Sequence, residues 1–572
     1  MKPTENHKPA AITHSDIEPE LSRRGMLRAA ATGSAALATA LMTPVAKAQV
    51  SPGPGAQNAS NPSRPEATFE VRQRANATHF WESIAAGEQR RSGDEARYKS
   101  ERYYASFTKT LPSNPYGEVD PAAFRTLQAA LRSGRSTAFD RIPLDSSASR
   151  TLANPQGAFK YEPYGLDSHA TRIAPSHAFR SAALAGEMAE VYWQAIARDV
   201  PFSQYRSDPL VADAVADLNR LSVTPGAAAN GRTTADKLFR GETVGDLIGP
   251  YISQFLWHEI AWGPSIIEQR YESPAPSRDF MLDEVNWLHI QRGGAPLETA
   301  TFDSQRRYIF NNRTLGEYVH RDVSFQAYLN AALILLGFGT EALADGNPYK
   351  SDIDNQGAFV SLGAPFILDI VTKAAQTSLT GAWYQKWREH RLLRPEAYAG
   401  RVHFHVRGSR SYELHSDILN SYALEVLNVQ NGVSLLPLAY VEGSPTHPSY
   451  PAGHATIAGA CVTVLKALFD EDFVIPNAKV ANIDGSALDN YRGDALTVGN
   501  ELNKLANNIA IGRDAAGVHY RQDGIQGLQA GEQQAISLLQ DQSLFCNERE
   551  FDGFSFTKFD GSVVSIKDGR VY

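Results

Sequence analysis

The sequence of 572 residues lacks the features that mark several classes of protein. It has only 2 cysteines, Cys461 and Cys546, too few for a framework of disulfides. No basic stretch stands out and the formal net charge is −8, which argues against nucleic acid as a partner. The apolar segment 324–338 has a central run too short to span a membrane. We therefore expect a mature protein that is not embedded in a membrane, with a buried free thiol at Cys461 and with pairing to Cys546 left open.

Sustained alternation of apolar and polar residues, the pattern of a half-buried strand, is also scarce. Helical periodicity is common instead: an apolar stripe runs along 178–199, and similar patterns cover 208–221, 324–338 and 372–393. Long helices with few strands predict an all-α fold, a large single domain built from packed helical bundles.

The N-terminus has the pattern of an export signal. Arg23 and Arg24 precede an alanine-rich apolar stretch, and Ala46-Lys47-Ala48 fits the small-x-small rule for cleavage. We predict a twin-arginine signal peptide over 1–48, a flexible mature N-terminus over 49–67 and one helical domain over 68–572, in a protein that is periplasmic or secreted. An uncleaved N-terminal membrane anchor is the alternative.

The short motif Pro451-Ala452-Gly453-His454 is followed by an apolar run of helical composition, 455–462. Pro451 and Gly453 punctuate the start of that helix, so the backbone N–H of Gly453 would point out of a helix N-terminus, where oxyanions bind. Outlying basic residues could complete a cage around such an anion; they are Lys386, Arg394, Arg513 and His519.

Arg394 precedes Pro395, and a residue before proline is pushed out of the α region. We therefore expect the helix of 372–393 to end near Arg394, which would free the guanidinium to turn towards the cage. A basic helix end that complements the helix dipole is the alternative for this residue alone.

Three motifs in this order resemble those of the vanadium-dependent haloperoxidase and acid-phosphatase superfamily: Lys386 spaced before Arg394-Pro395, then Pro451-Ala452-Gly453-His454, then Arg513-x5-His519-x3-Asp523. The resemblance implies that vanadate is held by Lys386, Arg394, Gly453, Arg513 and His519. It implies that His519 is the vanadium ligand and His454 the acid–base partner, and that Asp523 orients a neighbouring group such as His519. Ala452 departs from the family pattern, which has serine there.

Three details resemble the bromoperoxidase branch. Arg394 lies eight residues after Lys386, where acid phosphatases and fungal chloroperoxidases have seven, and the interval from His454 to Arg513 is long. His447, seven residues before His454, matches a second active-site histidine of that branch. Trp383 lies three residues before Lys386. Two roles are equally consistent with this position: a wall of the halide pocket or a plain core tryptophan.

The resemblance implies an exported, vanadate-dependent enzyme that oxidises bromide or iodide with hydrogen peroxide and halogenates small organic acceptors. Phosphate and vanadate share their geometry, so an acid phosphatase with the same cage is one alternative. A non-catalytic oxyanion-binding protein, suggested by Ala452, is another. We also expect a homo-oligomer, a dimer or larger.

The segment 347–357 is rich in oxygen-bearing side chains and prone to turns. Alternate oxygens in such a run can converge on a hard cation such as calcium. The segment resembles the calcium loop of red-algal bromoperoxidases, which implies side-chain ligands from Asp352, Asp354 and Gln356, with carbonyls of Asn347 and Tyr349. A solvated turn is the alternative.

Overall fold

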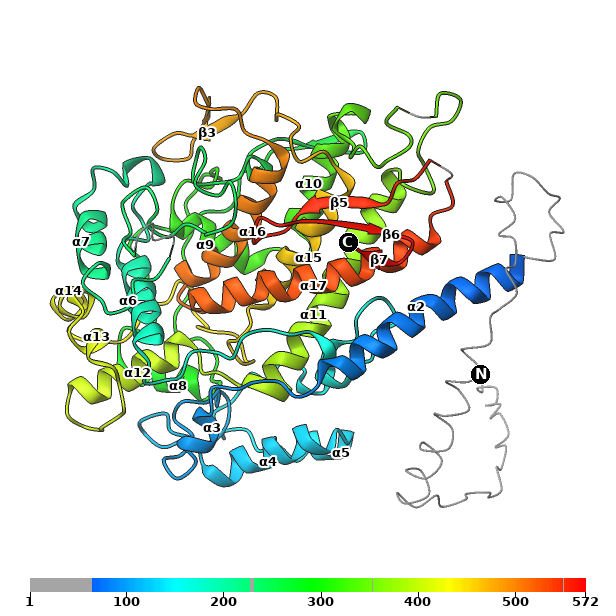
Figure 1. Cartoon of the computed structure of the whole chain (residues 1–572). Helices are drawn as coiled ribbons and strands as arrows, with labels where there is room; N and C mark the ends of the chain where they lie inside the picture. The colour runs from blue at the N-terminus through cyan, green and yellow to red at the C-terminus, as the bar shows by residue number, and fades with distance from the viewer. Residues whose placement is uncertain (1–63, 227–230, 352, 549) are drawn as a thin grey trace, which may run out of the picture. The chain divides into compact units, whose positions relative to one another are not determined.

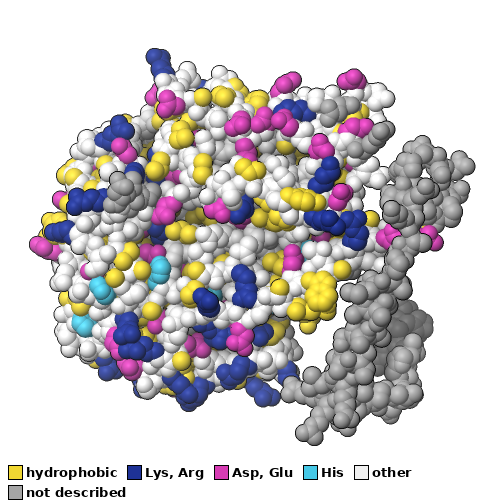
Figure 2. Space-filling view, in the orientation of Figure 1, with side chains coloured by type: hydrophobic (Ala, Val, Ile, Leu, Met, Phe, Trp, Pro, Cys, Tyr) yellow, Lys and Arg dark blue, Asp and Glu magenta, His cyan; other side chains and the backbone are white. Residues whose placement is uncertain are grey.

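The computed structural model describes residues 64–226, 231–351, 353–548 and 550–572. The predicted signal peptide therefore lies outside the described residues, as does most of the predicted flexible segment; helix α2 begins at Arg64. Residues Thr68–Tyr572 form one compact unit. Over the face shown in Figure 2, basic and acidic side chains are interspersed.

Four long helices form the centre of this unit. Helix α15 (Gly453–Leu468) packs against α17 (Arg521–Phe545), α11 (Ala364–Tyr384) and α16 (Val498–Ala515) (Figure 1). Every residue of α15 except His454 is buried. Glycine makes the contact with α17 close, because a Cβ on Gly531 would lie 2.0 Å from the carbonyl oxygen of Thr456. The mostly apolar run after His454 is therefore the core of the fold.

The other helices surround this centre; their bounds are α2 Arg64–Ala86, α3 Asp94–Arg97, α4 Pro121–Ser133, α5 Ser136–Phe139, α6 Ala182–Ile196, α7 Pro209–Leu218, α8 Glu284–Gln291, α9 Asn312–Arg321, α10 Gln326–Gly337, α12 Pro395–Val406, α13 Ser416–Leu419 and α14 Tyr422–Asn431. The helices predicted over 178–199, 208–221 and 324–338 correspond to α6, α7 and α10. The prediction of a helical fold is confirmed.

Within the described residues, the strands are short and lie in three small antiparallel sheets that the sequence did not predict. They are β1 (Ile260–Trp262) with β2 (Ser265–Ile267), β3 (Lys479–Ala481) with β4 (Leu488–Asn490), and β5 (Phe554–Thr557), β6 (Val563–Lys567) and β7 (Arg570–Val571) in one sheet. Ile260 pairs with Ile267, Lys479 with Asn490 and Phe554 with Ile566. At two to five residues each, these strands are too short to give a clear alternation.

The helix predicted over 372–393 differs in detail from the observed one. Helix α11 ends at Tyr384 and continues as a π-helical turn, Gln385–His390, after which Arg391 takes a left-handed conformation. Arg394 is the residue before the first turn of α12, with Pro395 in that first turn. The helix was expected to end near Arg394, and this expectation is wrong by four residues, because the π-helical turn ends at His390. Pro395 instead begins a new helix, and the first turn of a helix suits proline.

The two cysteines are free, with Cys461 buried, as expected, and Cys546 partly buried. Among the described residues, no helix combines the length and the apolar character needed to cross a membrane.

Candidate active site

His519 lies at the centre of a buried cluster, just before helix α17. Its Nδ1 lies 2.8 Å from Oδ2 of Asp523, and Ser449 donates its hydroxyl to the same oxygen at 2.5 Å. On the other side of the ring, Arg394 lies 2.9 Å from Nε2. Because a guanidinium only donates, Nε2 carries the free electron pair and Nδ1 carries the proton. The ring is therefore a neutral imidazole with Nε2 as the atom that can bind a metal.

The pKa values agree with this arrangement. Burial, together with Arg394 and Lys386 nearby, lowers the pKa of His519 well below its usual range. Burial also raises the pKa of Asp523 to about 6, although Ser449 and Lys386 oppose the rise. Asp523 is thus an ionised acceptor at neutral pH, and His519 stays uncharged.

Three buried cations surround His519. Lys386 is fully buried, and Arg394 and Arg513 are only 2% and 4% exposed. None of the three forms an ion pair with a carboxylate of the described residues; each donates to backbone carbonyls instead, Lys386 to Pro448 at 2.8 Å and Arg513 to Val319 at 2.6 Å. The buried Nε of Arg513 has no hydrogen-bond partner within the described chain.

The positive charge of these three side chains is only partly neutralised by neighbouring groups. Burial and the repulsion from Arg394 lower the pKa of Lys386 well below its usual value. The pKa of Arg394 is itself lowered to about 9, and burial is the largest cause. The nearby Asp523 offsets only part of this charge. Buried charge of one sign is costly unless a counter-charge is present, so this cluster is built to receive an anion.

The N-terminus of helix α15 reaches the same cluster. A Cβ on Gly453 would lie 3.5 Å from the Trp383 ring and 4.0 Å from Cε of Lys386. The backbone N–H of Ala452 donates to the carbonyl of Asp523 at 2.8 Å. Ala452 is fully buried in the position before the helix, and no side-chain hydrogen bond caps this end. The helix end therefore adds its dipole to the three cations.

His447 and Trp383 form one wall beside Arg394. Arg394 donates to the carbonyl and to Nδ1 of His447, both at 3.0 Å. The rings of Trp383 and His447 are 4.8 Å apart, and Trp383 is only partly buried. Burial and Arg394 lower the pKa of His447 well below its usual range, so it is neutral.

His454 is partly accessible, with 30% of its side chain exposed. Its Nε2 lies 3.0 Å from Oδ1 of Asp322, a carboxylate that is itself 4% exposed. A buried carboxylate at this distance fixes the orientation of the imidazole.

The fold thus brings together all the residues predicted for the oxyanion site: Trp383, Lys386, Arg394, His447, Ala452, Gly453, His454, Arg513, His519 and Asp523. Sequence reasoning missed Asp322, Ser449 and Tyr440, whose hydroxyl lies 3.3 Å from Arg513. Ser449 lies inside the stretch from His447 to His454, so its closeness to the motif was a usable signal. Asp322 and Tyr440 had none, because only the tertiary fold places them here.

The predicted calcium loop lies apart from this cluster. Asp352 is outside the described residues, and Asp354 and Gln356 are exposed. Asn347 is buried and its side chain accepts from the N–H of Tyr349 at 3.1 Å. The described part of the chain contains no group of three or more His, Cys, Asp or Glu side chains able to hold a metal ion. Calcium binding here stays a prediction.

Comparison with known proteins identifies the family. Residues 367–545 match the family model described as the VCPO second helical-bundle domain. The vanadium-dependent bromoperoxidase of Ascophyllum nodosum is 38% identical over 489 residues, covering 81% of this chain and 87% of the relative. The chain belongs to the vanadium-dependent bromoperoxidase family, which is a family of peroxidase enzymes.

Two further relatives support the family membership. A vanadium-dependent bromoperoxidase of Corallina officinalis is 32% identical, covering 88% of this chain and 98% of the relative. A solved structure, the homohexameric second vanadate-dependent bromoperoxidase of Ascophyllum nodosum, superposes with a TM-score of 0.83 at 31% identity, covering 90% of this chain and 92% of that one. The resemblance given by the three motifs is confirmed over most of the chain.

Proposed function

We propose that this chain binds vanadate in the buried cluster and oxidises bromide or iodide with hydrogen peroxide. The observation that carries the proposal is the set of three buried cations, Lys386, Arg394 and Arg513, without a carboxylate partner among the described residues. Planar guanidinium groups match the oxygens of a trigonal or tetrahedral oxyanion. The names of the relatives, bromoperoxidases that depend on vanadium, agree with this charge pattern.

The residues present fit vanadate. His519 offers Nε2 as a single nitrogen ligand, and the cations with the helix end at Gly453 neutralise the remaining oxygens. The Nε–H of Arg513, which has no hydrogen-bond partner among the described residues, is available for such an oxygen. Bound vanadate would supply Lewis acidity that activates peroxide towards halide.

The chain's own side chains would then divide the remaining work. Asp523 and Ser449 hold His519 as a neutral ligand, with the proton on Nδ1. His454, held by Asp322, would give or take a proton at the open side of the cluster. His447 and Trp383 form the wall at which a halide would approach.

The test separates this function from the alternatives. We expect the purified protein to bind about one orthovanadate per chain, measured by equilibrium dialysis or by the vanadium NMR signal, and to lose this binding when Lys386 is replaced by methionine. Hydrolysis of an aryl phosphate by the metal-free protein, without halide oxidation, would replace the proposal with an acid phosphatase. Tight oxyanion binding with neither activity would replace it with a binding protein.

Four further properties belong to the proposal. The N-terminal pattern supports twin-arginine export, to the periplasm or the medium. The acceptor is a small organic molecule.

Calcium at Asp352, Asp354 and Gln356 would raise the melting temperature, and an unchanged melting temperature after exhaustive chelation would count against it. A homo-oligomer is supported by the homohexameric structural neighbour.

A further inference from the structure

A hollow of about 230 Å³ is lined in part by Tyr440, and Arg513 lies over the ring of Tyr440, 5.4 Å from its centre. Four segments enclose it: 274–280, 299–302, the end of α9 and 439–441. Most of its wall is apolar, from Pro274, Phe280, Ala300, Phe302, Ala439 and Val441. The hollow shares Tyr440 with the oxyanion cluster, but Lys386, Arg394 and His519 do not line it.

The polar groups of the hollow are mostly engaged with one another. His320 stacks on Tyr440 with ring centres 3.8 Å apart, and its nitrogens contact Glu317 and Glu442 at 3.2 and 2.7 Å. Arg321 pairs with Glu272 and lies over the ring of Phe302. In this group two basic side chains, His320 and Arg321, are engaged by three carboxylates.

Arg278 is the exception. Its side chain is exposed at the hollow and forms no ion pair with any described residue. A cation at the mouth of an apolar hollow, with the other polar groups already paired, gives the hollow a preference for an anion with an apolar body.

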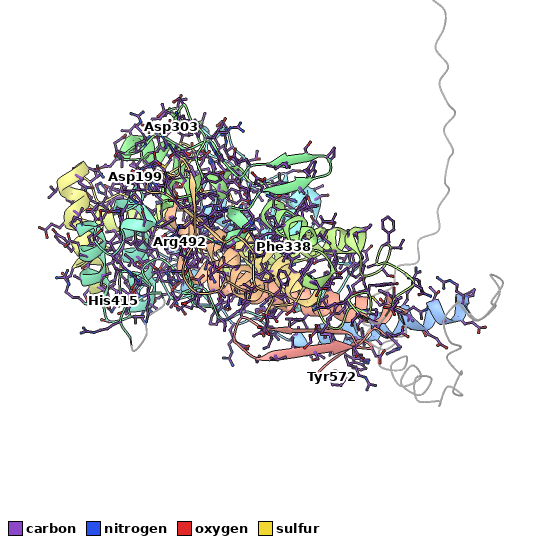
Figure 3. All side chains as sticks on the ribbon, turned by 90° about the horizontal axis from the view of Figure 1, so that it is seen from above. Asp199, Asp303, Phe338, His415, Arg492 and Tyr572 are labelled. Carbon is purple, nitrogen blue, oxygen red and sulfur yellow. The ribbon has the colours of Figure 1, made fainter. Side chains whose placement is uncertain are left out.

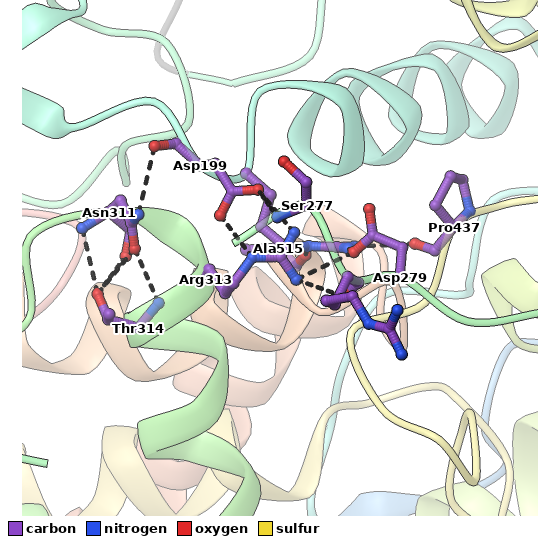
Figure 4. Close-up of polar contacts among 10 residues, drawn as sticks. Asp199, Ser277, Asp279, Asn311, Arg313, Thr314, Pro437 and Ala515 are labelled. Carbon is purple, nitrogen blue, oxygen red and sulfur yellow. Dashed lines mark hydrogen bonds and ion pairs between the residues drawn. The ribbon is translucent and has the colours of Figure 1, made fainter. Parts of the chain in front are cut away.

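The backbone that carries Arg278 is held firmly. Its carbonyl accepts from Arg313 at 2.7 Å, and the N–H of Ser277 donates to Asp199 at 2.8 Å (Figure 4). Asp279, the next residue, binds Arg198 and Arg313. The rim is therefore a fixed part of the fold.

Figure 3 places this region in the molecule. Asp303, which follows the lining residue Phe302, and Asp199, which holds the Arg278 segment, lie on the same side in the view from above, away from Tyr572.

We propose that this hollow binds a small aromatic carboxylate with a single ring. The ring would lie among Phe280, Phe302 and Ala300, and the carboxylate would pair with Arg278. A volume of about 230 Å³ is below the usual range for drug-sized ligands, which begins at about 300 Å³, so one ring is the size that fits. The inference stands on the hollow and does not rest on vanadate chemistry.

The experiment measures binding of benzoate to the vanadate-free protein by calorimetry or by ligand-observed NMR. We expect binding in the range of about 0.1–1 mM. Arg278→Ala should weaken it by up to about five-fold, the upper end of the scale for one exposed ion pair. Ala300→Phe should abolish it by filling the hollow, and benzyl alcohol, which lacks the charge, should bind more weakly than benzoate.

Arg306→Ala is the matched control, because Arg306 lines a neighbouring hollow and not this one; it should leave benzoate binding unchanged. Arg278 is exposed, so its variant should fold, and an unchanged melting temperature checks this. No binding at about 10 mM benzoate, equal binding by Arg278→Ala, or displacement of benzoate by inorganic phosphate would overturn the proposal. The last result would place benzoate in the oxyanion cluster.

Discussion

At the scale of single residues, the oxyanion cluster has one missing hydroxyl group. Ala452 stands where the resemblance calls for serine, at the start of α15 and fully buried. Its backbone N–H is already used by Asp523, so the side chain is the only part that differs. The remaining cations and the helix end are intact, which predicts a weaker site and not an absent one.

Ala452→Ser should tighten vanadate binding. A hydrogen bond to a charged acceptor contributes about 1.5–3 kcal/mol, or roughly one to two decades in affinity. Serine is favoured at the start of a helix, so stability should change little. Ala452→Gly, which adds no donor, is the control. Titration of the vanadate-free protein measures both, and an affinity that is unchanged or weaker in Ala452→Ser would show that this side chain does not face the anion.

Asp322→Asn tests the orientation of His454. The carboxylate contacts Nε2 at 3.0 Å, and loss of such a supporting group costs about 10–100-fold in activity. We expect the rate of bromination to fall in that range, while the vanadate affinity stays within about three-fold because Asp322 does not touch the cations. Equal activity in the variant and the parent, measured at saturating vanadate, would remove Asp322 from the mechanism.

At the scale of elements, the site depends on how helix ends meet. The motif before α15 could be predicted from the sequence, because Pro451, Gly453 and the apolar run after His454 are local signals. The π-helical turn Gln385–His390 could not, since no local pattern distinguishes it from α-helix. Asp322 was missed for a different reason: it ends α9, far in sequence from His454, and only packing joins them.

Helix α2 gives a prediction with a defined pH dependence. His79 on α2 contacts Asp541 of α17 at 2.7 Å and Glu82 at 2.9 Å. Burial lowers the pKa of His79, but these two carboxylates outweigh it and raise the pKa to about 9. A raised histidine pKa stabilises the folded state fully below about pH 6.5, and this stabilisation is lost as the pH rises through 9.

We expect the docking of α2 to weaken by about 1–2 kcal/mol over that range, after allowance for solvent screening. Amide hydrogen exchange along α2, corrected for the intrinsic rate at each pH, measures it. His79→Gln has no titrating group and should show a flat profile. Equal pH dependence in the two proteins would mean that His79 does not control the docking.

At the scale of the whole molecule, α2 carries large apolar side chains that stay mostly exposed, and the rings of Phe80 and Trp81 contact each other with 5.3 Å between their centres. Phe80, Trp81 and Ile84 are 58%, 63% and 57% exposed within one turn and a half. A cluster of this kind marks an association surface. A second copy of this chain, in the homo-oligomer proposed above, is the partner that we expect for this cluster.

Light scattering should therefore report an oligomer for the full chain, and Phe80→Glu with Trp81→Glu should shift it to a smaller species. Val429→Glu is the control, because Val429 on α14 is more exposed, at 82%, but is not part of this cluster. A monomeric parent protein, or a double variant of unchanged mass, would contradict the assignment of this face.

The central claim is that three buried cations and His519 form a vanadate site that performs halide oxidation. The most direct measurement is the rate of bromination of a chromogenic acceptor, with bromide and hydrogen peroxide, as orthovanadate is titrated into the metal-free protein. We predict that the rate rises with vanadate and saturates at about one equivalent per chain. His519→Ala should abolish this rate, because it removes the only proposed nitrogen ligand. A rate independent of vanadate, or no oxidation of bromide or iodide at any pH from mildly acidic to mildly basic, would contradict it.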